Sequence, residues 1–288
     1  MRKPANIAAS VRARLLKLSR ERNEPFQLLL TRYVLERLLY RLSLTAHRDR
    51  FVLKGAMLMT TWFENAFRPT QDLDLLGFGN PEPEVMLDVF RDVCRVVVED
   101  GVIFDSDALT IKHIREEFEY GGLRLKTNAT LDGARVRVLI DIGFGDAVEP
   151  QERYLPVLLD LPAPRVRVYP PEAVIAEKFE AMVMLGRANS RMKDFYDIWV
   201  LARSNEFAGD ALPRAIRATF DRRGTQIPAV RPDALTAAFA ADAMKQQQWT
   251  SFVENIAVQP GTLSEVIEDI AAFLMPRAEA ARALAATG

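Results

Sequence analysis

The chain has 288 residues, of which 49% are hydrophobic and 27% are charged, and its formal net charge is −1. This length and composition suit one large or two modest folded domains and argue against wholesale disorder. A single cysteine excludes an internal disulfide framework, two histidines argue against a zinc site, and no apolar run is long enough to span a membrane. We therefore expect a cytoplasmic protein without a membrane partner.

The net charge hides an uneven distribution. Residues 1–50 carry twelve Lys or Arg and four Asp or Glu, whereas residues 81–160 carry nine and seventeen. A basic segment on a nearly neutral protein suggests a polyanion partner. Two other interpretations fit equally well: a solvated helix face, and a surface that packs against the acidic middle of the same chain.

The N-terminal segment predicts two amphipathic helices, over residues 7–22 and from residue 26 to about 42. Apolar residues recur there at spacings of three and four, which is the helical period. Most such stripes are core. On the second helix we expect an exposed side that carries Arg32, Arg37 and Arg41, a candidate strip for RNA phosphates.

The stretch that follows predicts a buried strand at 51–53, a turn, a helix over about 56–64, and a second strand at 71–76. Asp72 and Asp74 are two apart, so on a strand they project from the same face. An Asp-x-Asp pair is often only a solvated turn, but this pair lies in an apolar run where an unpartnered charge is costly. Two converging carboxylates suit a hard divalent cation such as Mg²⁺.

The turn before that helix adds the features of a phosphate site. Gly55 opens the helix, where backbone N–H groups and the helix dipole favour an anion, and Lys54 adds a positive charge. Metal carboxylates opposite a phosphate cradle are typical of nucleotidyl or phosphoryl transfer. No P-loop motif occurs, which argues against a P-loop kinase.

The next segments alternate in type. Residue 83 to about 100 predicts a helix with its valines inward, and three strands follow at 109–118, 122–131 and 134–142. Asp132-Gly133 is a strong hairpin turn signal between the last two. Prolines mark residues 150–171 as a linker.

The remainder of the chain predicts helices. One runs from 171 or 172 to about 185, and another opens within 191–197 with Ser190 as its N-cap. Further helices are expected at about 209–220, 233–246, 248–256 and 261–284. Arg214, Arg217, Arg222 and Arg223 form a second basic cluster.

Four motifs in order resemble the AbiEii-type toxins of abortive-infection and type IV toxin–antitoxin systems, within the DNA polymerase beta-like nucleotidyltransferase superfamily. The resemblance spans roughly residues 45–205. The motifs are Lys54-Gly55, Arg68-Pro69-Thr70-Gln71-Asp72-Leu73-Asp74, Ala176-Glu177-Lys178, and Arg191-Met192-Lys193-Asp194-Phe195-Tyr196-Asp197. Family members often carry a second glycine where this chain has Ala56.

The resemblance implies an α+β fold: a nucleotidyltransferase mixed β-sheet core flanked by helices, with a C-terminal helical domain in a bilobed arrangement. We accordingly expect basic N-terminal helices over 1–46 that pack on the core, the nucleotidyltransferase core over 47–168, and the helical domain over 169–288.

The resemblance also assigns roles to residues. Asp72 and Asp74 would hold metal, and a third acid, matched by Asp141, would complete the metal site or act as the base that deprotonates the attacking hydroxyl, with Asp146 as the competitor for the third place. Lys54, Gly55, Arg68 and Thr70 would line the triphosphate, with Lys193 or Arg191 at a phosphate. Lys178 and Asp194 would complete the catalytic set.

Plainer interpretations stand beside these assignments. Asp141 could cap the backbone of Gly143–Gly145, and Lys178 could be a surface lysine paired with Glu177 and Glu180. Asp194 could be a first-turn acid favoured by the helix dipole.

The function implied is transfer of a nucleotide monophosphate from an NTP to RNA, expected at tRNA 3′ ends, with Mg²⁺ as cofactor and translation blocked. The basic N-terminus and the 214–223 cluster would guide the RNA, and an AbiEi-like antitoxin is an expected partner, which could act through Thr70 phosphorylation. The alternatives are a small-molecule nucleotidyltransferase of the antibiotic-modifying type and an inactive nucleotide-binding regulator.

Overall fold

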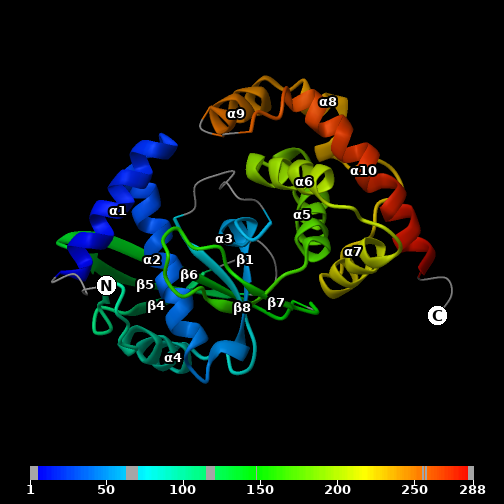
Figure 1. Cartoon of the computed structure of the whole chain (residues 1–288). Helices are drawn as coiled ribbons and strands as arrows, with labels where there is room; N and C mark the ends of the chain where they lie inside the picture. The colour runs from blue at the N-terminus through cyan, green and yellow to red at the C-terminus, as the bar shows by residue number, and fades with distance from the viewer. Residues whose placement is uncertain are drawn as a thin grey trace. The chain divides into compact units, whose positions relative to one another are not determined.

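The computed structural model describes residues 6–62, 71–114, 121–146, 148–254, 256 and 258–284. The chain divides into two compact units (Figure 1). The first comprises Met1–Gly145 and Pro150–Tyr169, and the second comprises Asp146–Glu149 and Pro170–Gly288. We call them the sheet unit and the helical unit.

In the described residues, one mixed sheet of eight strands forms the centre of the sheet unit, with strand order β3-β5-β6-β2-β1-β8-β7 and β4 paired to β5. Strand β2 pairs in parallel with β6, and β1 pairs in parallel with β8, whereas the other pairs are antiparallel. The strands are β1 (Phe51–Lys54), β2 (Leu73–Gly77), β3 (Val102–Phe104), β4 (Thr110–Ile114), β5 (Gly122–Leu131), β6 (Ala134–Phe144), β7 (Gln151–Tyr154) and β8 (Arg165–Val168). This mixed sheet with flanking helices confirms the expected α+β class.

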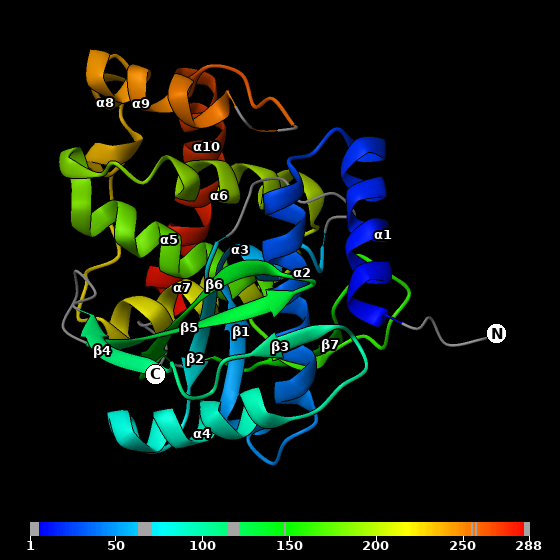
Figure 2. The same cartoon turned by 90° about the vertical axis from the view of Figure 1, so that its left-hand side faces the viewer.

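Two helices cover one face of this sheet (Figure 2): α2 (Phe26–Ser43) and α4 (Pro83–Arg95). Leu39 and Leu42 of α2 lie beside Leu53 and Leu75, and the Phe90 ring of α4 lies 5.3 Å from that of Phe51. Because side chains alternate along a strand, the intervening residues face the opposite side.

Two further helices belong to the sheet unit. Helix α1 (Ile7–Arg22) packs against α2, and α3 (Gly55–Met59) packs against β1 and β2. The predicted bounds of the first two helices are confirmed to within one residue. Helix α3 ends earlier than the expected 56–64, although residues 63–70 lie outside the described part of the chain.

The predicted exposed strip of arginines on α2 is wrong. Arg41 is buried and donates two hydrogen bonds to the fully buried Asp100, at 2.6 and 3.0 Å. Arg32 pairs with Glu36, and Arg37 is buried and donates to the Pro162 carbonyl oxygen. The guanidinium carbons of Arg37 and Arg41 lie 4.9 Å from the ring centroids of Tyr40 and Phe104, respectively. Long side chains of this kind can pack against apolar groups, so the helical period alone could not show which side faced solvent.

Two boundaries also differ from the sequence expectation. Helix α4 ends at Arg95, where Val96 turns extended, and Val97 is 94% exposed instead of inward. The β-branched run Val96–Val98 is a poor helix former, which accounts for the early end. The expected linker at 150–171 contains β7 and β8, because β8 finds its partner in the distant strand β1.

The β5–β6 hairpin confirms its predicted turn. Asp132 and Gly133 have φ angles of 46° and 78°, and Leu131 lies opposite Ala134. Positive φ at both central residues is the type I′ geometry that matches strand twist. The turn therefore fixes which residues of β5 and β6 lie opposite one another.

The helical unit contains α5 (Pro171–Leu185), α6 (Met192–Ser204), α7 (Ala211–Arg222), α8 (Ala237–Ala240), α9 (Ala243–Val253) and α10 (Leu263–Ala283). Helix α5 packs on α7, and α10 packs on α6 and α7. The expected helix over 233–246 is interrupted, because the Asp242 side chain caps the start of α9. None of the helices in the described residues is both long and apolar enough to cross a bilayer.

Candidate active site

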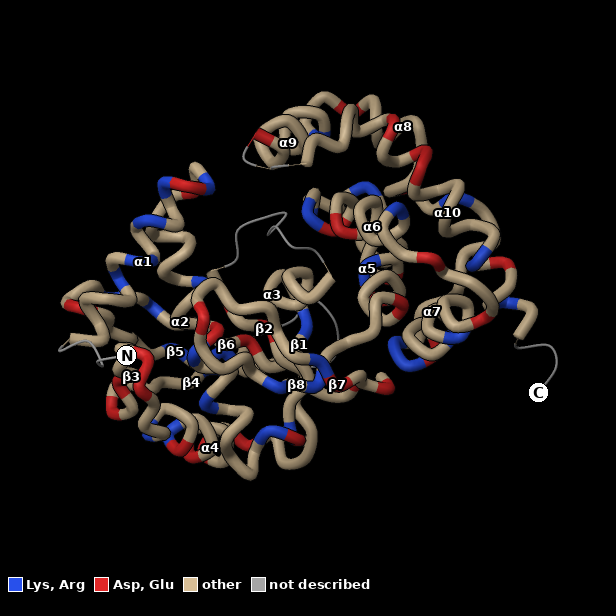
Figure 3. Tube along the Cα trace, in the orientation of Figure 1, with Lys and Arg blue, Asp and Glu red and all other residues tan. Residues whose placement is uncertain are grey.

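A row of five charged residues crosses five neighbouring strands of the sheet unit. Lys112 of β4 lies opposite Arg124 of β5, Arg124 lies opposite Asp141 of β6, Asp141 lies opposite Asp74 of β2, and Asp74 lies opposite Lys54 of β1. Residues directly opposite on paired strands share a face. The row therefore reads, in order, as two cations, two anions and a cation on the face opposite α2 and α4. Figure 3 shows basic and acidic positions along these neighbouring strands.

An acid cluster lies at the centre of this row. One carboxylate oxygen from each of Asp72, Asp74 and Asp141 lies within 4.8 Å of the others, and all three residues are partly buried. Two oxygens on opposite sides of a bound Mg²⁺ are about 4.2 Å apart, so small side-chain rotations would bring this set onto one ion. The donor set and its spacing fit a hard divalent cation.

Gly55 leaves room for the cluster. It has a φ of +72°, and a Cβ placed on it would lie 1.8 Å from Oδ2 of Asp74. Both features exclude a side chain at this position. Because Gly55 has no side chain, the Asp74 carboxylate can occupy the space beside it. This role is additional to the phosphate role expected of the turn. The neighbouring Lys54 amine lies 5.6 Å from the Tyr169 ring centroid.

Arg124 is a site residue that sequence reasoning missed. Its Nε and Nη2 donate to the two carboxylate oxygens of Asp141 at 2.6 and 2.5 Å. The pKa of the guanidinium is raised, chiefly by this hydrogen bond, and the charges of Asp72 and Asp74 add to the effect. The sequence contained the information needed to find Arg124, because the Asp132-Gly133 turn sets the register that places residue 124 opposite residue 141.

Other expected residues lie elsewhere or outside the described chain. Asp146, the competitor for the third carboxylate, contacts Arg223, the C-cap residue of α7, at 3.4 Å and belongs to the helical unit. Arg68 and Thr70 fall within residues 63–70, outside the described part of the chain. The structure thus brings Asp141 to Asp72 and Asp74.

In the helical unit, Lys178 joins a buried ion-pair cluster. Its amine lies 2.5 Å from Oδ1 of Asp194 and 2.9 Å from Oδ2 of Asp197, and its side chain is 16% exposed. The alternative in which Lys178 is a surface lysine paired with Glu177 and Glu180 is wrong, because both glutamates contact Arg223 instead.

The start of α6 carries the remaining expected residues. Asp194 lies in the first turn and is buried. Arg191 occupies the N-cap position, so the expected Ser190 cap is wrong, and Lys193 is exposed. The helix start therefore presents Lys193 to solvent, while Asp194 and Asp197 face Lys178.

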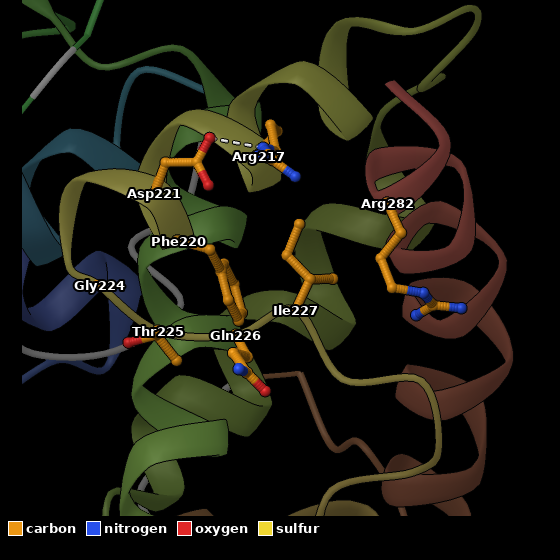
Figure 4. A pocket seen from close by; sticks show the side chains of 8 residues that line it. All are labelled: Arg217, Phe220, Asp221, Gly224, Thr225, Gln226, Ile227 and Arg282. Carbon is orange, nitrogen blue, oxygen red and sulfur yellow. Dashed lines mark hydrogen bonds and ion pairs between the residues drawn. The ribbon is translucent and has the colours of Figure 1, made fainter. Parts of the chain in front are cut away.

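The basic cluster at 214–223 is largely neutralised by carboxylates. Arg214 pairs with Asp210 at 2.7 Å, Arg217 with Asp221 at 2.5 Å, and Arg223 with Glu180 at 2.9 Å. A cavity of about 520 Å³ lies beside the second pair and is also lined by Phe220, Ile227 and Arg282 (Figure 4). It contains no residue of the expected catalytic set.

Comparisons with known proteins identify the family of this chain and solved structures with a similar fold. The family model described as nucleotidyl transferase AbiEii toxin, type IV TA system, matches residues 37–281. The crystal structure of JHP933 from Helicobacter pylori has a TM-score of 0.52 at 15% identity and covers 91% of this chain and 96% of its own. A second H. pylori structure, provisionally assigned as a nucleotidyltransferase, has a TM-score of 0.51 at 17% identity and covers 90% and 97%. No curated protein matches in sequence.

Proposed function

Because the chain belongs to the AbiEii nucleotidyltransferase toxin family, we propose that it transfers a nucleotide monophosphate from an NTP to RNA, at the 3′ end of tRNA, and thereby blocks translation. The observation that carries this proposal is the convergence of Asp72, Asp74 and Asp141 within 4.8 Å of one another. Such transfer requires a site that gathers the negative charge of a triphosphate around fixed cations.

The reaction is a displacement at the α-phosphorus. The acceptor hydroxyl oxygen forms the new bond to phosphorus, the bond to the β-phosphate oxygen breaks, and pyrophosphate leaves with that electron pair. The hydroxyl proton passes to a base or to water. When bound by Asp72, Asp74 and Asp141, Mg²⁺ would neutralise charge on the phosphates and on the attacking oxygen.

The chain's own residues have separate tasks in this proposal. Lys54 and Gly55 hold the triphosphate next to Asp74, since both lie beside that carboxylate. Arg124 orients Asp141, because both carboxylate oxygens accept hydrogen bonds from that guanidinium, and each oxygen keeps a lone pair for a metal ion. Lys178, Asp194, Lys193 and Arg191 remain proposed members of the catalytic set, as do Arg68 and Thr70.

Purified protein incubated with tRNA, Mg²⁺ and each NTP labelled at the α-phosphorus tests this proposal. We expect label in tRNA with one preferred nucleotide, and loss of transfer by more than about 100-fold in Asp72→Ala, because loss of a direct metal ligand exceeds the usual cost of an outer one. Asp160→Ala, an exposed aspartate of the sheet unit outside the cluster, is the matched control. Transfer by Asp72→Ala at the control's rate would refute the mechanism.

The same assay separates the alternative functions. Label in small acceptors such as aminoglycosides, with none in RNA, would support a small-molecule nucleotidyltransferase. Nucleotide binding without pyrophosphate release would support an inactive regulator. We also propose a cognate antitoxin as partner, which co-expression and growth assays would test.

A further inference from the structure

The open face of strands β4, β5 and β6 carries an arrangement of cations that none of the expected roles uses. These strands contain five Lys or Arg residues, and all five share one face: Lys112, Arg124, Lys126, Arg135 and Arg137. The only carboxylate in the three strands is Asp141, at the end nearest the acid cluster. We call the four cations other than Arg124 the basic face.

The shared face follows from the register. Lys112 is opposite Arg124, which is opposite Asp141. Two residues further along β5, Lys126 lies opposite Leu139, and Arg137 and Arg135 lie opposite Asn128 and Thr130. Because residues two apart on a strand point the same way, all these side chains emerge together, opposite the face covered by α2 and α4.

These cations are open to a ligand. Lys112, Arg135 and Arg137 are exposed and Lys126 is partly exposed. Within the described ranges, none of these four has a carboxylate within ion-pair distance. The pKa of Lys126 is lowered, chiefly by the neighbouring charge of Lys112 and also by Arg137 and Arg124. Lys126 is thus repelled by Lys112 and Arg137, with Asp141 as the opposing charge, and an anionic ligand on this face would relieve the repulsion.

The ordering of charge along the face indicates how the ligand lies. Arg124 joins the basic face to the acid cluster through Asp141. From residue 124 to residue 130, β5 extends about 20 Å at about 3.3 Å per residue, enough to follow several nucleotides. A polyanion on the basic face would therefore run toward the acid cluster at one end.

We propose that the basic face binds the phosphodiester backbone of the single-stranded 3′ end of the acceptor RNA and leads its terminal hydroxyl to Asp72, Asp74 and Asp141. The proposal rests on the proposed function for the identity of the acceptor. Its occupant is an RNA strand because the face offers charges at strand spacing, with Thr110, Asn128 and Thr130 among them. Leu139, opposite Lys126, is a lone apolar side chain among the four cations and does not make the apolar centre that a protein partner requires.

The test measures binding separately from transfer. A fluorescently labelled twelve-nucleotide RNA is titrated with protein that carries Asp72→Asn, so that the protein cannot modify the RNA. Fluorescence anisotropy measures binding at several salt concentrations. Two double variants, Lys112→Gln/Lys126→Gln and Arg135→Gln/Arg137→Gln, each remove two cations. Arg91→Gln/Arg95→Gln on α4 removes the same charge from the opposite face and is the matched control.

We expect each double variant of the basic face to weaken binding by at least about fivefold at low salt. The slope of log K against log salt should fall in magnitude by about 1.4, since each phosphate contact on a single strand contributes about 0.7. The control should change binding by less than twofold. In the transfer assay with Asp72 intact, the same variants should raise KM for RNA and leave KM for the NTP unchanged.

Two outcomes would overturn the proposal: unchanged RNA binding in both double variants, or an equal loss in the control. The readouts also separate this proposal from the proposed function. If wild-type protein labels tRNA while the basic-face variants bind RNA normally, the binding surface is wrong and the function stands. If RNA binding depends on the basic face but no NTP is transferred, the function is wrong and the surface stands.

Discussion

Two basic regions of the sheet unit show that the number of arginines in a segment does not determine their role. Helix α2 carries Arg32, Arg37 and Arg41, all buried, and Arg41 and Arg32 are paired with Asp100 and Glu36. The basic face carries four cations, exposed or partly exposed, and its strands contain no carboxylate except Asp141.

The difference comes from what lies opposite each charge. Helix α2 packs on the apolar face of the sheet. A buried arginine there destabilises the fold unless a carboxylate or another acceptor compensates its charge. The basic face lies on the other side of the same strands, where water solvates unpaired cations. The first region stabilises the fold, and the second is available to bind a ligand.

The largest expected effect is a loss of folding stability when a buried ion pair of α2 is broken. Asp100→Ala leaves the Arg41 guanidinium buried without its carboxylate, and breaking such a pair costs about 3–5 kcal/mol. We expect urea denaturation to show a loss of this size. Asp210→Ala removes the exposed partner of Arg214 and should cost less than about 1 kcal/mol. If both variants lose the same stability, burial does not distinguish the two kinds of arginine.

The next prediction uses pH within the same buried region. Burial raises the pKa of Glu36 from 4.5 to about 7. Between those values the unfolded chain has released its proton and the folded chain retains it, so stability from this group is present below pH 4.5 and is lost as the pH rises toward 7. Glu36→Gln cannot titrate, and its amide oxygen can still accept from the Leu158 N–H, which lies 3.1 Å from Glu36.

We therefore expect Glu36→Gln to lose less stability than wild type between pH 5 and pH 7.5, by up to about 3 kcal/mol. Urea denaturation at both pH values measures this difference. Glu21→Gln, on the exposed surface of α1, should leave the wild-type dependence in place. Parallel curves for wild type and Glu36→Gln would show that another group controls this pH range.

The same comparison explains how far the fold could be predicted. Helical periodicity gave α1 and α2 almost to the residue, and Asp132-Gly133 identified the β5–β6 hairpin, because both signals are local. The pairing of β8 with β1 joins segments more than a hundred residues apart, and no local pattern encodes it. Likewise, Asp100 is 59 residues from Arg41, so the burial of that arginine was not readable.

The candidate site divides in the same way. Asp72 and Asp74 follow from an Asp-x-Asp pair predicted on one strand, although β2 begins at Leu73, and Asp141 was added through the family resemblance. Arg124 was missed although the hairpin register determines it, because no motif marks it. The roles of Lys178 and Asp194 remain predictions.

Arg124 shares a property with each region. It is paired with a carboxylate, as Arg32 and Arg41 of α2 are, and it is partly exposed, as Lys126 of the basic face is. Arg124→Gln removes a positive charge beside three carboxylates, so we expect Mn²⁺ to bind several-fold more tightly, as followed by its electron paramagnetic resonance signal. Arg137→Gln should have little effect, because it lies four residues along β6 from Asp141, about 13 Å and beyond the screening length at physiological salt. Weaker Mn²⁺ binding in Arg124→Gln would mean that the orientation of Asp141 by Arg124 outweighs the effect of its charge.

The smallest expected effect concerns the stability of the basic face itself. Arg135→Gln/Arg137→Gln removes two exposed side chains without a carboxylate partner in the described structure, so we expect the free energy of unfolding to change by less than about 0.5 kcal/mol per residue. The sign is informative. Cations that repel one another are relieved by neutralisation, so a slight gain in stability at low salt, which vanishes at high salt, is the signature of a surface kept for a ligand. A loss above about 1 kcal/mol, by urea denaturation, would instead make these arginines part of the fold, as they are on α2.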